Sequence, residues 1–276
     1  MMNHLLNEEQ FPAGFLPAWF EARHRQALEQ AGQLPEPSRR MESWRFGTPG
    51  NESLENFEAA PPVAPEALAS IIREHASMPD AIRIVYANGL PVSIPEELPE
   101  GLAVMDLEDF VLQYPDAARK HLETAPETLG SEKLAALNTA LQHNGLVIMA
   151  DREISCPLEI FHFISGDNVA VFPATLVIAE TGSRLHILER HVSADHGSQF
   201  CGALQQHHLS SASSVKYALV QELNSRSRAV ELCHIMADDS AEMEHLVSHP
   251  GAAWARQETV CLLNGDSANV RLLSAR

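Results

Sequence analysis

The sequence has few basic side chains and few aromatic ones. Its 276 residues include 19 Lys and Arg against 37 Asp and Glu, which gives a formal net charge of −18 at pH 7. Because nucleic acids and anionic membrane surfaces repel a chain of this charge, the balance argues against both as partners. Aromatic residues make up 6% of the chain, so few rings are available to stack on sugars.

Long hydrophobic runs and cysteines are also scarce. The best apolar run, Val169–Ala179, is short and broken by Pro173, and no N-terminal stretch has the pattern of a signal peptide. We therefore expect a cytoplasmic protein that does not enter a membrane. The four cysteines lie far apart in a chain long enough to fold without covalent links, so we expect free thiols rather than a disulfide framework.

One short pattern returns four times in the last third of the chain. Each copy is a turn followed by an alternating strand, and the first apolar residues of the four strands are Leu185, Val215, Met243 and Val270. Successive copies therefore lie 30, 28 and 27 residues apart, a period typical of stacked repeats. The pattern predicts a β-solenoid, whose flat faces and two ends favour docking or scaffolding.

Each later repeat contains two strands, for example 215–222 and 229–236, as expected for a flattened coil with two principal faces. In the second strand, alternation puts Val230 and Leu232 on one face and Glu231 and Cys233 on the other. Because a carboxylate is usually solvated, Glu231 predicts that its face points outward.

The chain before the repeats has a different periodicity. We predict an N-terminal helical region at residues 1–145, which includes a β-hairpin, and a β-helix core at 146–276. The hairpin signal is the alternation over 82–86 followed by the turn pair Asn88-Gly89. Asn144-Gly145 predicts a left-handed cap at the end of the last helix. The expected helices cover 15–30, 65–75, 107–113 and 132–143, and the expected early strands cover 146–149, 158–164, 169–172 and 175–179.

Several segments together resemble one known family. They are 42–46 (ESWRF), 84–92 (IVYANGLPV), 137–141 (LNTAL) with 144–148 (NGLVI), 157–160 (PLEI) and 263–268 (LNGDSA). In this order and spacing they are similar to segments of the SufB/SufD proteins, and most of all to the SufD-like members. The resemblance runs from about Leu34 to the last residue.

The resemblance implies a mainly β protein with a right-handed parallel β-helix. It also implies a non-catalytic scaffold subunit in iron–sulfur cluster assembly by the SUF system, where SufB, SufD and the SufC ATPase form a complex. The implied partners are therefore SufB-like and SufC-like proteins. No catalytic residue and no tightly bound cofactor is implied for this chain alone. A transient iron–sulfur cluster would lie at a subunit interface, between a cysteine of one subunit and a histidine of the other.

The sequence ends at Arg276, directly after the fourth copy of the repeat, whereas the family continues with further turns and a closing helical module. We therefore expect a β-helix that lacks a C-terminal cap and frays or self-associates through an exposed strand edge. Three outcomes fit this expectation: a homodimer joined edge to edge, a partner that supplies the missing coils, and a gene truncation that leaves a poorly stable remnant. A truncated interaction module without assembly activity is an alternative function.

Cys233 and Cys261 are the candidate metal ligands. Each follows the first apolar residue of its own repeat by 18 residues, so we expect the two to stack in neighbouring coils about 4.8 Å apart. That distance would allow a shared metal or sulfur. The alternative is a structural role, because free cysteine behaves as a small hydrophobe and is commonly buried.

A group of histidines between residues 186 and 208 also invites a metal site. Zinc needs three or four side chains that converge on one point, and the spacing of these histidines does not show convergence. His207 and His208 in particular must point to opposite faces of a strand. We therefore expect surface or core positions for the five histidines, His186, His191, His196, His207 and His208.

The segment 42–46 predicts a cluster of packed side chains. Trp44 and Phe46 are expected to insert under the helical region, and Arg45 is expected to pair with a carboxylate.

The main competing function is a β-helix enzyme that acts on carbohydrates. Such an enzyme needs two or three carboxylates aligned on one outer face of successive coils. Only Glu231 and Glu258 approach equivalent levels in the repeats, so the sequence favours a protein without catalytic activity.

Overall fold

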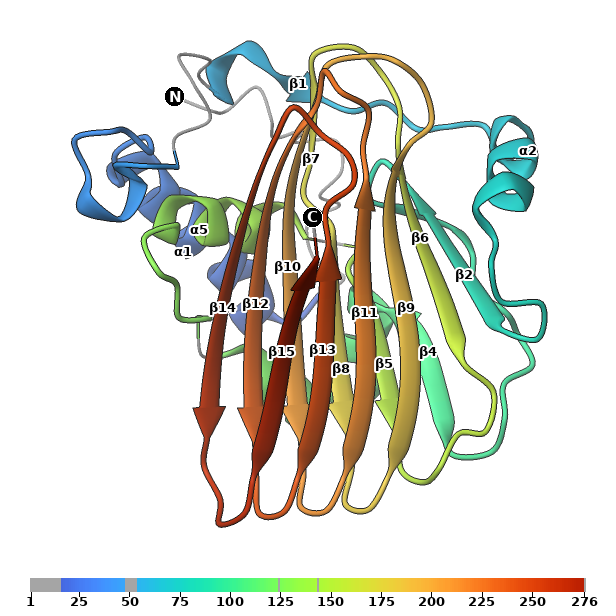
Figure 1. Ribbon diagram of the computed structural model, residues 1–276. Helices are drawn as coiled ribbons and strands as arrows, with labels where there is room; N and C mark the ends of the chain where they lie inside the picture. The colour runs from blue at the N-terminus through green and yellow to red at the C-terminus, as the bar shows by residue number, and fades with distance from the viewer. Residues whose placement is uncertain (1–15, 48–53, 124, 143, 276) are drawn as a thin grey trace.

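The computed structural model is a β-solenoid with helices packed along its outside (Figure 1). It describes residues 16–47, 54–123, 125–142 and 144–275. Two sheets face each other, and the chain passes from one to the other as it coils. The predicted fold, a mainly β solenoid preceded by a helical region, is confirmed.

Parallel pairing links the strands of each sheet, except for the antiparallel pairs β2–β3 and β4–β5. Sheet A contains eight strands: β1 (Glu58–Ala59), β4 (Leu102–Asp106), β5 (Leu146–Ala150), β7 (Val169–Val171), β8 (Ala174–Ala179), β10 (Gln199–Leu209), β12 (Arg228–Ala237) and β14 (Trp254–Leu263). Sheet B contains seven: β2 (Ile82–Ala87), β3 (Leu90–Ser93), β6 (Leu158–Ile164), β9 (Arg184–Ser193), β11 (Ser214–Glu222), β13 (Glu242–Ser248) and β15 (Asn269–Ala275).

The four repeat markers stack on one another as the period predicts. Leu185 pairs with Val215, Val215 with Met243 and Met243 with Val270 along the parallel strands of sheet B. All four belong to, or pack against, the same hydrophobic cluster between the sheets. The periodic turn therefore sets the register of sheet B, and one apolar residue per coil forms a continuous row in the core.

The helices of the N-terminal region lie close to the predicted ones. The bounds of α2 (Pro65–His75) and α3 (Leu107–Gln113) are as predicted, and α1 (Ala18–Gln33) and α5 (Glu132–Leu141) differ by a few residues. Phe15 and His143, which bounded two of the predictions, lie outside the described residues.

Two local features differ from the prediction. Helix α4 (Pro115–Leu122) was missed because only Tyr114 separates it from α3, and a proline at the first helical position disguises its start. The predicted left-handed cap at Asn144-Gly145 is wrong, because the helix ends at Leu141 and its C-cap residue, Gln142, has a φ of −83°. The hairpin turn is confirmed: Asn88 and Gly89 both have positive φ values, 50° and 79°.

The helices cover the outer faces of the early coils. Leu137 of α5 packs in one cluster with Phe200 and Leu232 on the outside of sheet A, while Leu68 of α2 packs with Phe161 on the outside of sheet B. Strands β1 to β4, which precede residue 145, extend the two sheets directly. The domain boundary at residue 145 stays a prediction.

Helix α5 is anchored to sheet A by one buried amide. Asn138 is fully buried, and its side-chain nitrogen donates hydrogen bonds to the carbonyl oxygens of Pro173 and Gly202, each at 2.8 Å. These two carbonyls lie where β8 begins and inside β10, so the amide links the helix to two neighbouring coils.

We expect Asn138→Ala to lower the free energy of unfolding by about 1–3 kcal/mol, because it leaves two buried carbonyl oxygens without that donor. Urea unfolding followed by circular dichroism measures the change. Asn264→Ala, in an exposed turn, is the matched control and should change the free energy of unfolding by less than about 0.5 kcal/mol. Equal effects of the two substitutions would contradict the anchoring role.

The segment around Trp44 forms the expected cluster of packed side chains only in part. Trp44, at the end of the short 3₁₀ helix Glu42–Trp44, is fully buried, and its indole nitrogen donates a hydrogen bond to the carbonyl oxygen of Gly130. Phe46, however, is 94% exposed, so its predicted insertion is wrong. The Phe46 ring lies under the guanidinium of Arg45 and makes a cation–π contact with it. This contact takes the place of the predicted ion pair between Arg45 and a carboxylate.

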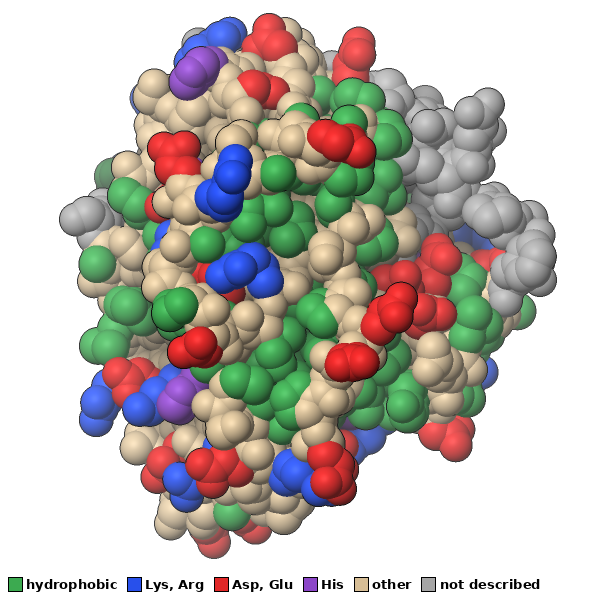
Figure 2. Space-filling model, turned by 90° about the vertical axis from the view of Figure 1, so that its right-hand side faces the viewer, with side chains coloured by type: hydrophobic (Ala, Val, Ile, Leu, Met, Phe, Trp, Pro, Cys, Tyr) green, Lys and Arg blue, Asp and Glu red, His purple; other side chains and the backbone are tan. Residues whose placement is uncertain are grey.

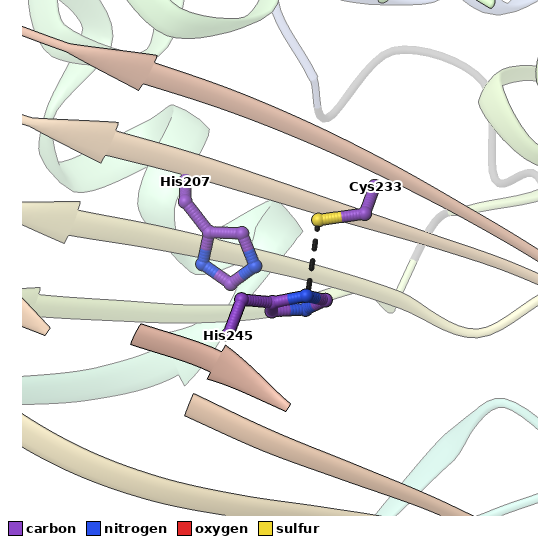
Figure 3. Close-up of side chains that lie close together, drawn as sticks. All are labelled: His207, Cys233 and His245. Atoms are coloured by element: carbon purple, nitrogen blue, oxygen red, sulfur yellow. Dashed lines mark hydrogen bonds between the residues drawn. The ribbon is translucent and has the colours of Figure 1, made fainter. Parts of the chain in front are cut away.

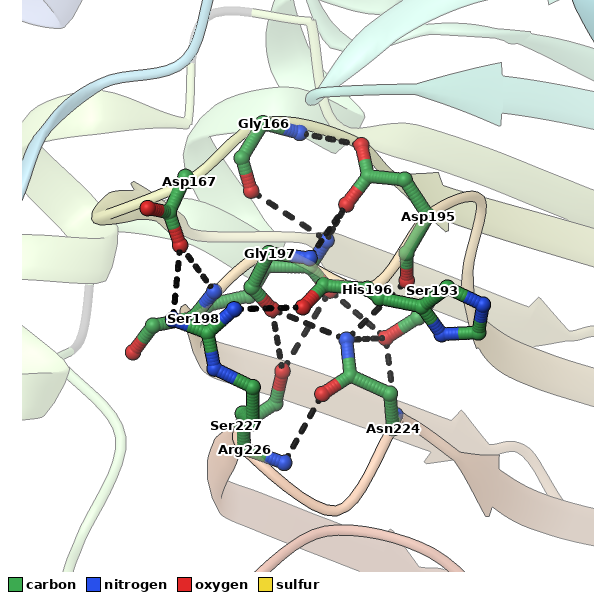
Figure 4. Close-up of polar contacts among 11 residues, drawn as sticks. Gly166, Asp167, Ser193, Asp195, His196, Gly197, Ser198, Asn224, Arg226 and Ser227 are labelled. Atoms are coloured by element: carbon green, nitrogen blue, oxygen red, sulfur yellow. Dashed lines mark hydrogen bonds and ion pairs between the residues drawn. The ribbon is translucent and has the colours of Figure 1, made fainter.

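A polar network ties successive turns together at one end of the coils (Figure 4). The carboxylate of Asp195 accepts hydrogen bonds from the backbone nitrogens of Gly166 and Gly197, at 2.7 and 2.8 Å. The side-chain nitrogen of Asn224, one coil further on, donates to the carbonyl oxygen of Gly197 at 2.9 Å. Partial burial opposes ionisation, but these hydrogen bonds lower the pKa of Asp195. The network therefore fixes the spacing of three coils.

Acidic and basic side chains are interspersed with hydrophobic ones on the face displayed in Figure 2. No helix in the described ranges is long and apolar enough to cross a membrane.

Candidate functional site

The interior of the solenoid contains a band of polar side chains between apolar rows. Alternation directs every second residue of each strand inward, and at the middle of the strands these residues are titratable rather than aliphatic. All of them are buried: His162, Glu189, His191, Cys201, His207, Tyr217, Glu231, Cys233 and His245.

The first cluster in this band is centred on His191. Its Nδ1 lies 3.0 Å from a carboxylate oxygen of Glu231, and its Nε2 lies 2.8 Å from Glu189. The hydroxyl of Tyr217 donates a hydrogen bond to the other oxygen of Glu189. His162 approaches Glu189 with its Nε2 at 3.7 Å. One imidazole thus bridges a carboxylate of sheet B and a carboxylate of sheet A.

The charges of the first cluster are set by this pairing. Burial opposes the charged form of His191, but Cys201, Glu231 and Glu189 around it raise its pKa well above the usual value. Burial also opposes ionisation of Glu189, but the hydrogen bond with His191 and the nearby His162 lower its pKa to about 2. His191 is therefore held as an imidazolium against the ionised Glu189 at neutral pH.

The second cluster consists of His207, Cys233 and His245, which point toward one another from strands β10, β12 and β13 (Figure 3). The sulfur of Cys233 lies 3.7 Å from Nε2 of His245, and one ligand atom from each residue lies within 4.8 Å of the others. Both ring nitrogens of His207 lack a hydrogen-bond partner. The three side chains are fully or almost fully buried.

The second cluster is electrically neutral. Burial lowers the pKa of His207 well below its usual value, and it lowers the pKa of His245 to about 4. Burial, with Cys261 and the carboxylates nearby, raises the pKa of the Cys233 thiol. Two neutral imidazoles and one thiol therefore face one another. Each of the three side chains has a nitrogen or sulfur atom that can bind a metal ion.

The predicted stacking of Cys233 on Cys261 is wrong. Cys233 pairs with Thr259, and Cys261 pairs with Ile235. Strands β12 and β14 pair with an offset of 26 residues, whereas the markers in sheet B differ by 28, because the intervening turns differ in length. The offset of two residues keeps both cysteines on the inner face but displaces them along the strands.

The predicted orientation of Glu231 is also wrong. Its side chain is fully buried between the sheets, because the imidazolium of His191 compensates its charge there. Glu258 lies on the opposite, outer face, where it accepts hydrogen bonds from the backbone nitrogen of Leu129 and the hydroxyl of Ser131. The two carboxylates therefore cannot form the aligned outer pair that a glycan-cleaving site needs.

The five histidines expected at surface or core positions do not form one site. His186 and His196 are exposed, and His208 contacts His121 on the outer face of sheet A. His191 and His207 are core residues in the two different clusters. His207 points into the core and His208 points to the outer face, so the prediction that the two side chains point to opposite faces of the strand is confirmed.

Sequence reasoning missed His162 and His245. A usable signal was present for His245, which follows the marker Met243 by two residues, as Tyr217 follows Val215. These two rings pair in register along sheet B and stack with centroids 5.4 Å apart. Extending the repeat alignment by two positions would therefore have placed His245 inside the solenoid.

Comparison with known proteins matches residues 162–276 to the family model described as "SUF system FeS cluster assembly, SufBD core domain". The match supports a SufB/SufD-family protein. The matched residues cover β7 to β15 and part of β6, which include the two clusters in the interior. The resemblance seen in the short motifs is thereby confirmed.

Individual relatives within the SufB/SufD family support the same assignment. The iron–sulfur cluster assembly protein SufD of Bacillus subtilis is 26% identical over 190 residues, which cover 64% of this chain and 42% of that protein. A SufBD family protein of Pyrococcus horikoshii is 28% identical over 160 residues, or 50% of this chain and 36% of that protein. The matched regions thus span less than half the length of these relatives.

Proposed function

We propose that this SufB/SufD-family chain acts as a SufD-like scaffold subunit in iron–sulfur cluster assembly and docks with SufB-like and SufC-like proteins. The observation that carries the proposal is the match of residues 162–276 to the SufBD core domain, which coincides with the stacked coils of the solenoid. Family membership supports a role in cluster assembly. The specific partners are inferred from the SufD-like resemblance.

The geometry suits docking better than catalysis on a large substrate. A solenoid offers flat, rigid faces because each coil is held by its neighbours. The titratable groups of the interior are shielded by both sheets, with Glu189, His191 and Glu231 fully buried. A polysaccharide cannot reach them without unfolding of the coils. We therefore favour a non-catalytic scaffold over a carbohydrate-active enzyme.

An iron–sulfur cluster is cargo in this proposal. It would be held transiently where the chain meets a partner. The alternative to docking with these partners is self-association. It would be recognised by a homodimer that persists when the other SUF proteins are present.

The test is co-expression of this chain with the SufB-like and SufC-like proteins of the same organism, followed by affinity purification through a tag on the chain. We expect a stable complex, identified by light scattering coupled to size exclusion, that contains all three proteins. The untagged partner pair, expressed without this chain and passed over the same resin, is the control for non-specific capture. A folded chain that elutes alone or as a homodimer in the presence of both partners would refute the docking role.

A further inference from the structure

We propose that His207, Cys233 and His245 bind one zinc-class divalent metal ion inside the solenoid. This site is independent of the scaffold role, because it lies between the sheets and requires no partner protein. It differs from a shared site of Cys233 and Cys261, since the two ligands that join Cys233 are histidines from β10 and β13.

The two buried clusters differ in how far neighbouring charged groups satisfy their histidines. Both nitrogens of His191 contact carboxylate oxygens, so the centre of the first cluster is an ion-pair network, and the unpartnered Nε2 of His162 beside it still lies 3.7 Å from a carboxylate oxygen of Glu189. His207 is fully buried, and neither of its nitrogens has a hydrogen-bond partner. A buried polar atom without a partner is uncommon in native proteins, and a bound ion is one way to satisfy it.

The distances between the three side chains fit a tetrahedral zinc site. In a tetrahedral zinc site with bonds of about 2.3 Å to sulfur and about 2.0–2.1 Å to nitrogen, the sulfur and a nitrogen lie about 3.5 Å apart. The distance between the Cys233 sulfur and the His245 Nε2 is 3.7 Å, and no pair of the three ligand atoms is more than 4.8 Å apart. Small rotations of the rings are enough to bring all three atoms to bonding distance of one ion.

The chemistry of the three ligands also fits a zinc-class ion. A thiolate with two imidazoles is a borderline ligand set that suits zinc and related first-row ions, and it leaves a fourth position for water. When the ion binds, the S–H bond of Cys233 breaks, a sulfur–metal bond forms and the proton leaves to solvent, with no change of oxidation state. The site then carries one net positive charge.

The surroundings can balance that charge and hold the rings. Glu231 is buried in the same interior, and its Oε2 has no hydrogen-bond partner. The ring of Tyr217 stacks on His245 and meets His207 edge to face, with centroids 5.4 and 4.5 Å away. Its hydroxyl donates to Glu189, so Tyr217 fixes both imidazoles and links them to a carboxylate, as outer groups do at metal sites.

The experiment measures metal content of the full chain. The protein is expressed with added zinc chloride, dialysed against metal-free buffer and analysed by inductively coupled plasma mass spectrometry. We expect about one zinc per chain, and a loss of at least about five-fold in Cys233→Ser and in His207→Asn. Cys261→Ser and His208→Asn are the matched controls, because each changes the same residue type nearby without removing a ligand, and both should retain zinc.

A spectroscopic readout keeps the test valid if a ligand variant fails to fold. Unfolded wild-type protein is refolded with cobalt chloride, and the thiolate-to-cobalt charge-transfer absorption is recorded. We expect this absorption in wild type and in Cys261→Ser. Zinc-free wild-type protein that also refolds without the cobalt–thiolate absorption would overturn the proposal. Loss of zinc in Cys261→Ser together with retention in a folded Cys233→Ser would do the same.

Discussion

Replacing Glu189 with leucine is expected to lower the free energy of unfolding by about 3–5 kcal/mol. The carboxylate is fully buried, accepts a hydrogen bond from Tyr217 and lies 2.8 Å from the imidazole of His191. Leucine fills a similar volume, but it leaves the positive charge of His191 with only Glu231 to balance it. Removing one partner of a buried charged network costs more than the packing of leucine returns.

Urea unfolding of the Glu189→Leu variant measures this loss, with Glu242→Leu as the control. Glu242 is exposed on strand β13, so its substitution should change the free energy of unfolding by less than about 0.5 kcal/mol. A double-mutant cycle sharpens the test. In a His191→Leu background, Glu189 has lost its cation, and Glu189→Leu should cost far less than in wild type. Additive effects of the two substitutions would contradict the proposed coupling.

Acidification from pH 6.5 to pH 4 is expected to destabilise the protein, with a contribution of up to about 3 kcal/mol from His121 alone. His121 lies in α4 against His208 of β10, with ring centroids 4.3 Å apart. Burial, with a smaller effect of Lys120, lowers the pKa of His121 to about 4, against an ordinary value of 6.5. Between these pH values the unfolded chain binds a proton that the folded chain excludes.

The sign of the pH dependence follows from this difference in proton binding. The stability contribution is fully present above pH 6.5, falls as the pH drops, and is lost once the pH is below the folded pKa of about 4. Urea unfolding at several pH values measures the slope. His121→Phe keeps a ring against His208 and should flatten it, whereas His186→Gln, at an exposed position, should leave it unchanged. The same slope in both variants would assign the acid sensitivity to other groups.

The N-terminal elements and sheet B show how much of the fold local sequence can predict. Helix α2 begins at a proline and has the predicted bounds, and the hairpin follows directly from Asn88-Gly89. Both signals depend on backbone preferences of a few consecutive residues. The exposed ring of Phe46 was not predictable in this way, because its packing depends on which distant segment covers it.

The candidate site shows where prediction from sequence stopped. Cys233 was singled out because of its position in the repeat, but its neighbours were misassigned. The register of sheet A shifts between coils, from an offset of 28 residues for β10 and β12 to 26 for β12 and β14. The lengths of the turns between strands set these offsets. A turn that is shorter in one coil changes the pairing offset in one sheet without the same change in the other.

The sequence by itself determined that the chain coils as a solenoid, because a repeated turn places one apolar residue per coil in a common row. It also carried the motifs of the SufB/SufD family. Only the tertiary structure decided which polar side chains meet inside the coil. Glu231 points inward because His191, forty residues earlier in the chain, offers it a buried positive charge. Such pairing across two facing sheets depends on contacts between residues far apart in sequence, and no local pattern encodes it.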